Sequence, residues 1–176
     1  MNRIIVCLFI LCFSTFGCNS KTEEMIFPEN LELIHPGNRP CSACEAKVIS
    51  YLNITERSLY IFSDNIVDWQ EFADSYPDLS LVIYLGGKGK DAERSPEQIQ
   101  SFFEKRNFPY PVYLDPEDQF FEVNHLDTVP LDNKTTLFFL LRGNEVLDLY
   151  EFGIPILRAS QLEEHFGMQA IDIVSE

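Results

Sequence analysis

Cysteine is scarce in this chain beyond its apolar N-terminal segment. There are five cysteines among 176 residues, and Cys7, Cys12 and Cys18 lie in or directly after an apolar N-terminal segment, which leaves Cys41 and Cys44. A disulfide scaffold staples distant loops, and a closed zinc site needs about four ligands. A single Cys-x-x-Cys pair argues against both and favours redox chemistry, so we predict no metal and no cofactor.

Positive charge is also scarce. Thirteen Lys and Arg residues stand against 28 Asp and Glu residues, for a formal net charge of −15. Such a surface repels nucleic acid and anionic lipid headgroups, so no nucleic-acid partner is expected. The acidity says little about the type of reaction, because most of these carboxylates are expected to form an ordinary solvated face.

The sequence has no apolar run long enough to span a bilayer. Ile4–Phe16 is shorter than the roughly 17–25 residues that a membrane helix needs, and it follows a basic start at Arg3, which is typical of a secretion signal. Ser14–Cys18 resembles a bacterial lipoprotein cleavage box. We therefore predict a signal peptide over residues 1–17 and lipidation of Cys18, with a soluble secreted protein or an uncut anchor as the alternatives.

The predicted lipid would hold the protein on a bacterial membrane in the cell envelope, on the periplasmic or the surface side. Residues 18–30 are polar and contain Pro28, which is typical of a tether rather than a packed element. Residues 31–176 suit one domain with one core, and the sequence shows no internal repeat.

The Cys-x-x-Cys pair stands between two apolar segments. Leu31–Ile34 is strand-like, and Cys44–Leu52 is helix-like. At a helix start, the unpaired N–H groups and the positive end of the dipole favour a thiolate on the leading cysteine. On this reading Cys41 is the attacking thiol and Cys44 the resolving thiol.

The apolar pattern beyond the pair alternates between strand-like and helix-like segments. Ser95 and Pro96 mark a helix start, and Ser160 is read as the N-cap of a last short helix. Strands are predicted over 58–63, 79–85, 111–115, 135–141 and 145–152, and helices over 65–76, 95–106, 116–124 and 160–166. This order predicts a three-layer α/β domain with a mixed central sheet and a closing β-hairpin, whose turn is predicted at Arg142-Gly143-Asn144.

A strand, a Cys-x-x-Cys, a helix, an α/β middle and a closing hairpin with a helix resemble the thioredoxin-like fold. The segments Phe108–Asp115 and Thr136–Val146 are similar to the strand before the third helix and to the closing hairpin of that fold. The likeness is to membrane-tethered thiol-disulfide oxidoreductases, the TlpA- and ResA-like lipoproteins. It implies thiol-disulfide exchange through Cys41 and Cys44, with thiol- or disulfide-bearing envelope proteins as partners.

The chain departs from that family in three places. Pro40 precedes the first cysteine, where an aromatic residue is usual. Lys134-Thr135 stands where the family has a cis-proline, and the nearest proline is Pro130. A second alignment is also open, in which Leu59–Asp64 is the family's first strand and the two cysteines belong to an N-terminal extension.

Two functions from different classes therefore remain open. The first is a membrane-tethered thiol-disulfide oxidoreductase. The second is a non-catalytic thioredoxin-fold lipoprotein that binds another envelope protein and has a structural Cys41–Cys44 pair.

Other motifs favour ordinary structural roles. Gly86–Lys90 follows a predicted strand, but no Ser or Thr follows Lys90, so a loop is expected rather than a phosphate site. His35 is close enough in sequence to tune Cys41, although a structural role is the expectation. His125 and His165 show no metal-ligand spacing.

Overall fold

A computed structural model describes residues 23–39, 41, 43–56, 59–63, 67–87, 94–132 and 134–170. The predicted signal peptide, Cys18 and Pro40 lie outside these residues. In chain order the elements are β1 (Glu32–His35), β2 (Ala46–Asn53), the 3₁₀ helix η1 (Leu59–Phe62), α1 (Trp69–Ser75), β3 (Ser80–Gly86), α2 (Pro96–Glu104), β4 (Val112–Asp115), α3 (Gln119–Val123), the 3₁₀ helix η2 (Leu126–Thr128), β5 (Thr136–Arg142), β6 (Glu145–Leu149) and α4 (Pro155–Phe166).

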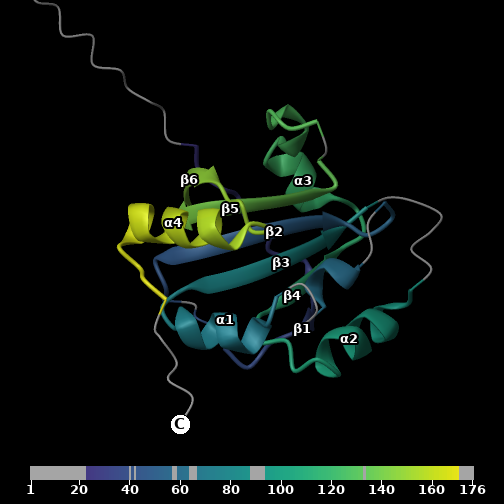
Figure 1. Ribbon diagram of the computed structural model, residues 1–176. Coiled ribbons are helices and arrows are strands. Elements are labelled where there is room, and N and C mark those ends of the chain that lie inside the picture. The colour runs from purple at the N-terminus through teal and green to yellow at the C-terminus, as the bar shows by residue number, and fades with distance from the viewer. Residues whose placement is uncertain are drawn as a thin grey trace, which may run out of the picture.

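One mixed sheet organises the domain (Figure 1). Its strand order is β1-β4-β3-β2-β5-β6. β2, β3 and β4 run parallel, while β1 pairs antiparallel with β4, and β5 pairs antiparallel with both β2 and β6. The predicted mixed sheet and closing hairpin are confirmed.

The predicted helix over Cys44–Leu52 is wrong, because residues Ala46–Asn53 form β2. This strand lies between β3 and β5 and is buried on both faces. A strand buried on both faces has a continuous apolar run in place of alternation, and periodicity cannot distinguish such a run from a buried helix.

Other elements also differ from the prediction, among them α3 (Gln119–Val123) and β6 (Glu145–Leu149), which are shorter than expected. The expected strand over 58–63 is the 3₁₀ helix η1. α1 starts later than expected, after Asp68, whose carboxylate accepts from the Glu71 N–H. α4 starts earlier, at Pro155, so Ser160 lies inside that helix and is not its N-cap. The Ser95 cap of α2 is confirmed, with Pro96 as the first helical residue.

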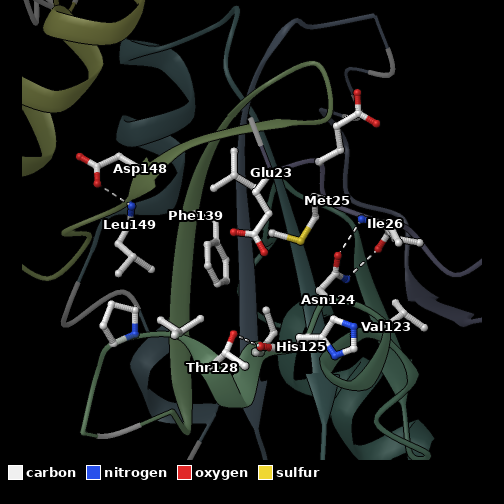
Figure 2. A pocket seen from close by; sticks show the side chains of 15 residues that line it. Glu23, Met25, Ile26, Val123, Asn124, His125, Thr128, Phe139, Asp148 and Leu149 are labelled. Carbon is white, nitrogen blue, oxygen red and sulfur yellow. Dashed lines mark hydrogen bonds between the residues drawn. The ribbon is translucent and has the colours of Figure 1, made fainter. Parts of the chain in front are cut away.

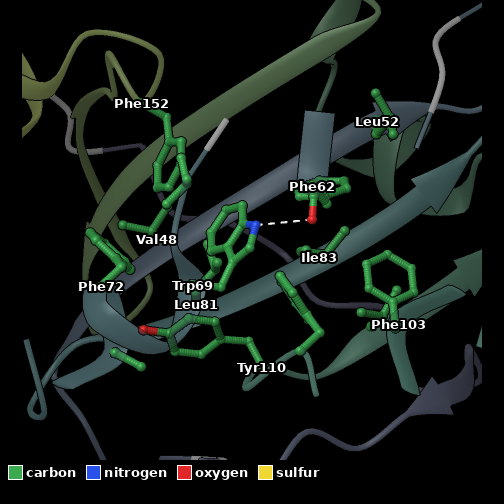
Figure 3. Packing of buried hydrophobic residues seen from close by; sticks show 14 of the residues in the cluster. Val48, Leu52, Phe62, Trp69, Phe72, Leu81, Ile83, Phe103, Tyr110 and Phe152 are labelled. Carbon is green, nitrogen blue, oxygen red and sulfur yellow. Dashed lines mark hydrogen bonds between the residues drawn. The ribbon is translucent and has the colours of Figure 1, made fainter. Parts of the chain in front are cut away.

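The sheet separates two hydrophobic clusters. α1, α2 and α4 pack in the larger cluster on one face, whereas α3 and η2 pack in the smaller cluster on the other. Figure 3 shows the centre of the larger cluster, where the Trp69 indole stacks on Phe152 at 5.1 Å between ring centroids and donates to the Phe62 carbonyl at 3.0 Å. Aromatic side chains bury a large apolar area each, so these rings stabilise the larger cluster.

Residues 23–27, here called the N-terminal strap, pack onto the domain instead of forming part of a tether. The Met25 N–H donates to the Asn144 carbonyl at 2.7 Å, and the Val146 N–H donates to the Glu23 carbonyl at 2.8 Å. Met25 is buried in the smaller cluster. The packed domain therefore begins about eight residues earlier than residue 31. None of the helices in the described ranges is long and apolar enough to cross a membrane.

Candidate functional site

Cys41 and Cys44 form a disulfide bond in the loop between β1 and β2. Their Cα atoms are 5.4 Å apart, and both residues are half-buried. The Cys44 N–H points at the Cys41 carbonyl at 3.4 Å, which closes a tight turn within the ring. The pair is thus assembled by local backbone geometry and stays partly accessible to solvent.

The surroundings of the pair differ from the sequence prediction. Cys44 precedes strand β2 and not a helix, so the positive end of a helix dipole that the sequence predicts next to the leading cysteine is not there. The loop is instead held by its neighbours, since the Gly143 N–H in the β5–β6 turn donates to the Glu45 carbonyl at 2.7 Å. On the other side, the Arg39 guanidinium donates to the Ala73 carbonyl at 3.1 Å and pairs with Asp74.

A groove of about 590 Å³ runs beside the disulfide, and we call it the disulfide groove. Besides the two cysteines, it is lined by side chains from β5, from the end of α4 and from the loop that follows, among them Arg142, His165, Phe166 and Met168. Arg142 donates to the His165 carbonyl at 2.6 Å and lies over the Phe166 ring at 5.6 Å. The groove thus places the Arg142 guanidinium, two carboxylates (Glu45 and Asp78) and apolar surface next to an accessible disulfide.

Sequence reasoning did not assign Arg142 or His165 to the site. Arg142 is predicted only as the start of a hairpin turn, and His165 only as a scattered histidine. They meet because the β5–β6 hairpin and the end of α4 both lie at the amino end of β2. A local sequence pattern carries no signal for such a contact.

The opposite end of the sheet, at the carboxyl ends of the parallel strands, has a different chemistry. One oxygen of Asp118 accepts from the Tyr51 hydroxyl at 2.9 Å and from the Gly87 N–H at 2.6 Å, which joins β2, β3 and the start of α3. Burial, together with the bond to Asp118, raises the pKa of Tyr51. Asn53 and Glu56 also line the hollow there, and no cysteine does.

The remaining sequence candidates have structural surroundings. The His35 ring is buried, donates a hydrogen bond from Nε2 to the Phe108 carbonyl at 2.7 Å and stacks on Phe103. It does not line the disulfide groove. Among the described residues, no three His, Cys, Asp or Glu side chains are grouped as a metal site requires.

Comparison with known proteins identifies the architecture. No protein-family profile and no curated protein sequence matches this chain. Solved structures do. A hypothetical protein from Sinorhizobium meliloti aligns with a TM-score of 0.54 and 13% identity over 86% of this chain and 92% of its own.

A thioredoxin-like protein solved in its oxidized form aligns with a TM-score of 0.52 and 15% identity over 81% of this chain and 90% of its own. The chain has a thioredoxin-like fold. A further thioredoxin-like superfamily protein, SPOA0173, aligns with a TM-score of 0.52 and 12% identity over 73% of this chain and 84% of its own.

The position of the two cysteines differs from that of the reactive pair in the family that the sequence resembles. In the family that the sequence resembles, the pair follows a strand and opens a helix. Here the strand that leads into α1 and β3 is β2, and Cys41 and Cys44 precede it. The pair therefore lies outside the family's usual turn, as in the second alignment, although the central strand is Ala46–Asn53 and not 59–64. The described residues also contain no cis peptide bond, so Pro130 does not form the family's cis-proline.

Proposed function

We propose that this protein is a lipid-anchored envelope protein that exchanges thiols and disulfides with other envelope proteins through Cys41 and Cys44. The observation that carries the proposal is the half-buried disulfide that opens into the disulfide groove. Structural disulfides of small domains usually connect distant segments, whereas this one closes a ring of neighbours beside a surface hollow.

The exchange involves two sulfur-transfer steps. A partner thiolate attacks one sulfur of the Cys41–Cys44 bond, which forms a mixed disulfide and releases the other sulfur as a thiolate. A second partner thiol, as its thiolate, then attacks the mixed disulfide. The partner leaves with its own disulfide, and the Cys41–Cys44 pair keeps two electrons and takes up two protons. The reverse sequence reduces a partner disulfide.

Cys41 is proposed as the thiol that attacks and Cys44 as the thiol that resolves. Cys44 is close to the start of β2, where Ala46 is already buried, while Cys41 lies farther out in the loop. Arg142, which lines the same groove, favours a thiolate over a thiol, whereas the carboxylates of Glu45 and Asp78 in that lining oppose it.

The anchor is proposed on the cleavage box before Cys18 and on the early start of the packed domain. From Cys18 to Glu23, an extended chain reaches only about 18 Å. A lipid on Cys18 would therefore hold the domain close to the membrane. Wild-type protein should partition with membranes, and a Cys18→Ala variant should not mature normally. Recovery of both forms as free protein of equivalent processed mass would contradict the anchor.

The exchange reaction is tested with the reduced protein and a fluorogenic disulfide peptide. Reduced wild type should cleave the peptide disulfide and release fluorescence up to one equivalent per Cys41–Cys44 pair, and Arg142→Gln should react more slowly because the thiolate loses a neighbouring positive charge. Arg94→Gln, which lies beside α2 and away from the groove, is the matched control. A wild-type rate equal to that of a Cys41→Ser/Cys44→Ser variant would contradict the proposal.

A non-catalytic binding protein is the second candidate. It is favoured by one observation, namely that the carboxyl end of β2, where the family has its reactive pair, carries Asn53 and Glu56 and no cysteine. On this reading Cys41 and Cys44 stabilise the loop, and substitution of either changes stability without changing any exchange rate.

A further inference from the structure

A second hollow lies on the other face of the sheet, away from the disulfide groove, and we call it the strap pocket. It encloses about 350 Å³ and is bounded by the N-terminal strap, by the segment from α3 through η2 and by β5 and β6. This volume is at the lower end of the range of about 300–1,000 Å³ found for small-molecule sites. The proposed thiol-disulfide function does not use this pocket.

The strap pocket has a mainly apolar lining. Met25, Leu126 and Phe139 are each at least 95% buried and belong to the smaller hydrophobic cluster. Figure 2 shows the Phe139 ring and the Met25 side chain among the residues that line the pocket. A ligand that enters would exchange water for apolar contact with these side chains.

The wall formed by the strap is fixed by a pair of hydrogen bonds. The Asn124 side chain accepts from the Ile26 N–H at 2.7 Å and donates to the Ile26 carbonyl at 2.8 Å. The same amide donates to the Phe120 carbonyl at 2.9 Å, so it is fully engaged in holding the strap to α3. The pocket is therefore built into the fold before any ligand binds.

The charges at the pocket are all of one sign. Glu23, Glu24 and Asp148 line it, His125 is the one other titratable side chain in the lining, and no Lys or Arg is part of it. In Figure 2 the Glu23 carboxylate points between Met25 and Phe139, toward the middle of the lining residues. No ion pair joins Glu23 to another described residue, while Asp148 lies 3.7 Å from His165. A cation in the pocket would meet a carboxylate that has no opposite charge of its own.

We infer that the strap pocket binds a small organic cation, in which an ammonium group is carried on an apolar ring or short chain. The ammonium would lie beside Glu23, and the apolar body would pack on Phe139 and Met25. The net charge of −15 adds a long-range attraction for the same class of ligand. An anion of equal size would be repelled by every charged group that lines the pocket.

The two methionines of residues 19–176 allow a direct test. Met25 lines the strap pocket and Met168 lines the disulfide groove, so their labelled methyl groups report on the two hollows separately. Residues 19–176 contain every strand and helix that the structure describes and both hydrophobic clusters. Three probes of similar size are titrated by methyl NMR: 2-phenylethylamine, 2-phenylethanol and 3-phenylpropionate.

The amine should shift the Met25 methyl resonance saturably and leave Met168 unchanged. The alcohol should bind at least about fivefold more weakly, and the carboxylate should not bind. Glu23→Gln should reduce the affinity for the amine to that for the alcohol. Glu29→Gln is the matched control, because Glu29 is exposed and lies outside the pocket, and it should bind the amine as wild type does.

Three results would overturn the inference. One is the absence of a saturable Met25 shift with the amine, and another is equal affinity for the amine and the alcohol. The third is unchanged amine binding in Glu23→Gln. The Met168 resonance shows whether each variant is folded, and none of these outcomes depends on whether Cys41 and Cys44 react.

Discussion

Reduction of the Cys41–Cys44 disulfide should lower the free energy of unfolding by a calculable amount. The bond closes a loop of four residues, with a sequence separation of 3. The chain-entropy relation for so short a loop gives about 2 kcal/mol of stabilisation at 25 °C. By linkage, the pair should then be about 40 mV more reducing in the folded than in the unfolded chain, since about 30 mV corresponds to 1.4 kcal/mol.

The assay is urea unfolding of residues 19–176 with and without a dithiol reductant. Trp69 is the only tryptophan and is 2% exposed, so its fluorescence reports on the loss of the larger hydrophobic cluster. The Cys41→Ser/Cys44→Ser variant is the control and should be insensitive to the reductant. A difference below about 0.5 kcal/mol between oxidised and reduced wild type would refute the reasoning, because the ring would then not constrain the unfolded chain as expected.

Other substitutions test the rest of the structure by the same unfolding assay. Tyr51→Phe should cost about 1–1.5 kcal/mol because the Asp118 carboxylate loses a donor, whereas Tyr150→Phe should cost less, since the buried Tyr150 hydroxyl has no hydrogen-bond partner among the described residues. Asp115→Ala should cost about 3 kcal/mol, because the Gln119 and Phe120 N–H groups both lose the carboxylate that accepts from them; exposed Asp132→Ala is the control. Burial raises the pKa of Tyr150, so stability should fall as pH rises above the unfolded value of about 10, and Tyr150→Phe should make that fall less steep. If the free energy of unfolding of Tyr150→Phe fell between pH 9 and 11 as steeply as that of wild type, the prediction for Tyr150 would be contradicted.

The parts of the fold that could be predicted are those with a local signal. Ser95 and Pro96 mark the start of α2 because a hydroxyl cap and a fixed φ act within one turn. The turn at Gly143 also has a local signal, because glycine tolerates positive φ. In the structure its φ is +61°. Such signals do not depend on the rest of the chain.

β2 could not be predicted because its structure is decided by its neighbours. Residues such as Val48 and Tyr51 form a strand when β3 and β5 pair on both sides, and the sequence segment alone fits a short buried helix equally well. The wrong prediction of a helix over Cys44–Leu52 also puts the two cysteines at a helix start. The disulfide groove could not be predicted for the same reason, since Arg142 and His165 reach it only through tertiary contacts.

The central claim is that Cys41 and Cys44 exchange disulfides with other envelope proteins. It is tested most directly by trapping in cells that express Cys44→Ser or Cys41→Ser, with envelope extracts alkylated and separated without reductant. Cys44→Ser should accumulate covalent adducts, because Cys41 can attack a partner disulfide but nothing resolves the product. Cys41→Ser should show far fewer. Adducts of Cys44→Ser no more abundant than those of Cys41→Ser would contradict the claim and leave a structural disulfide.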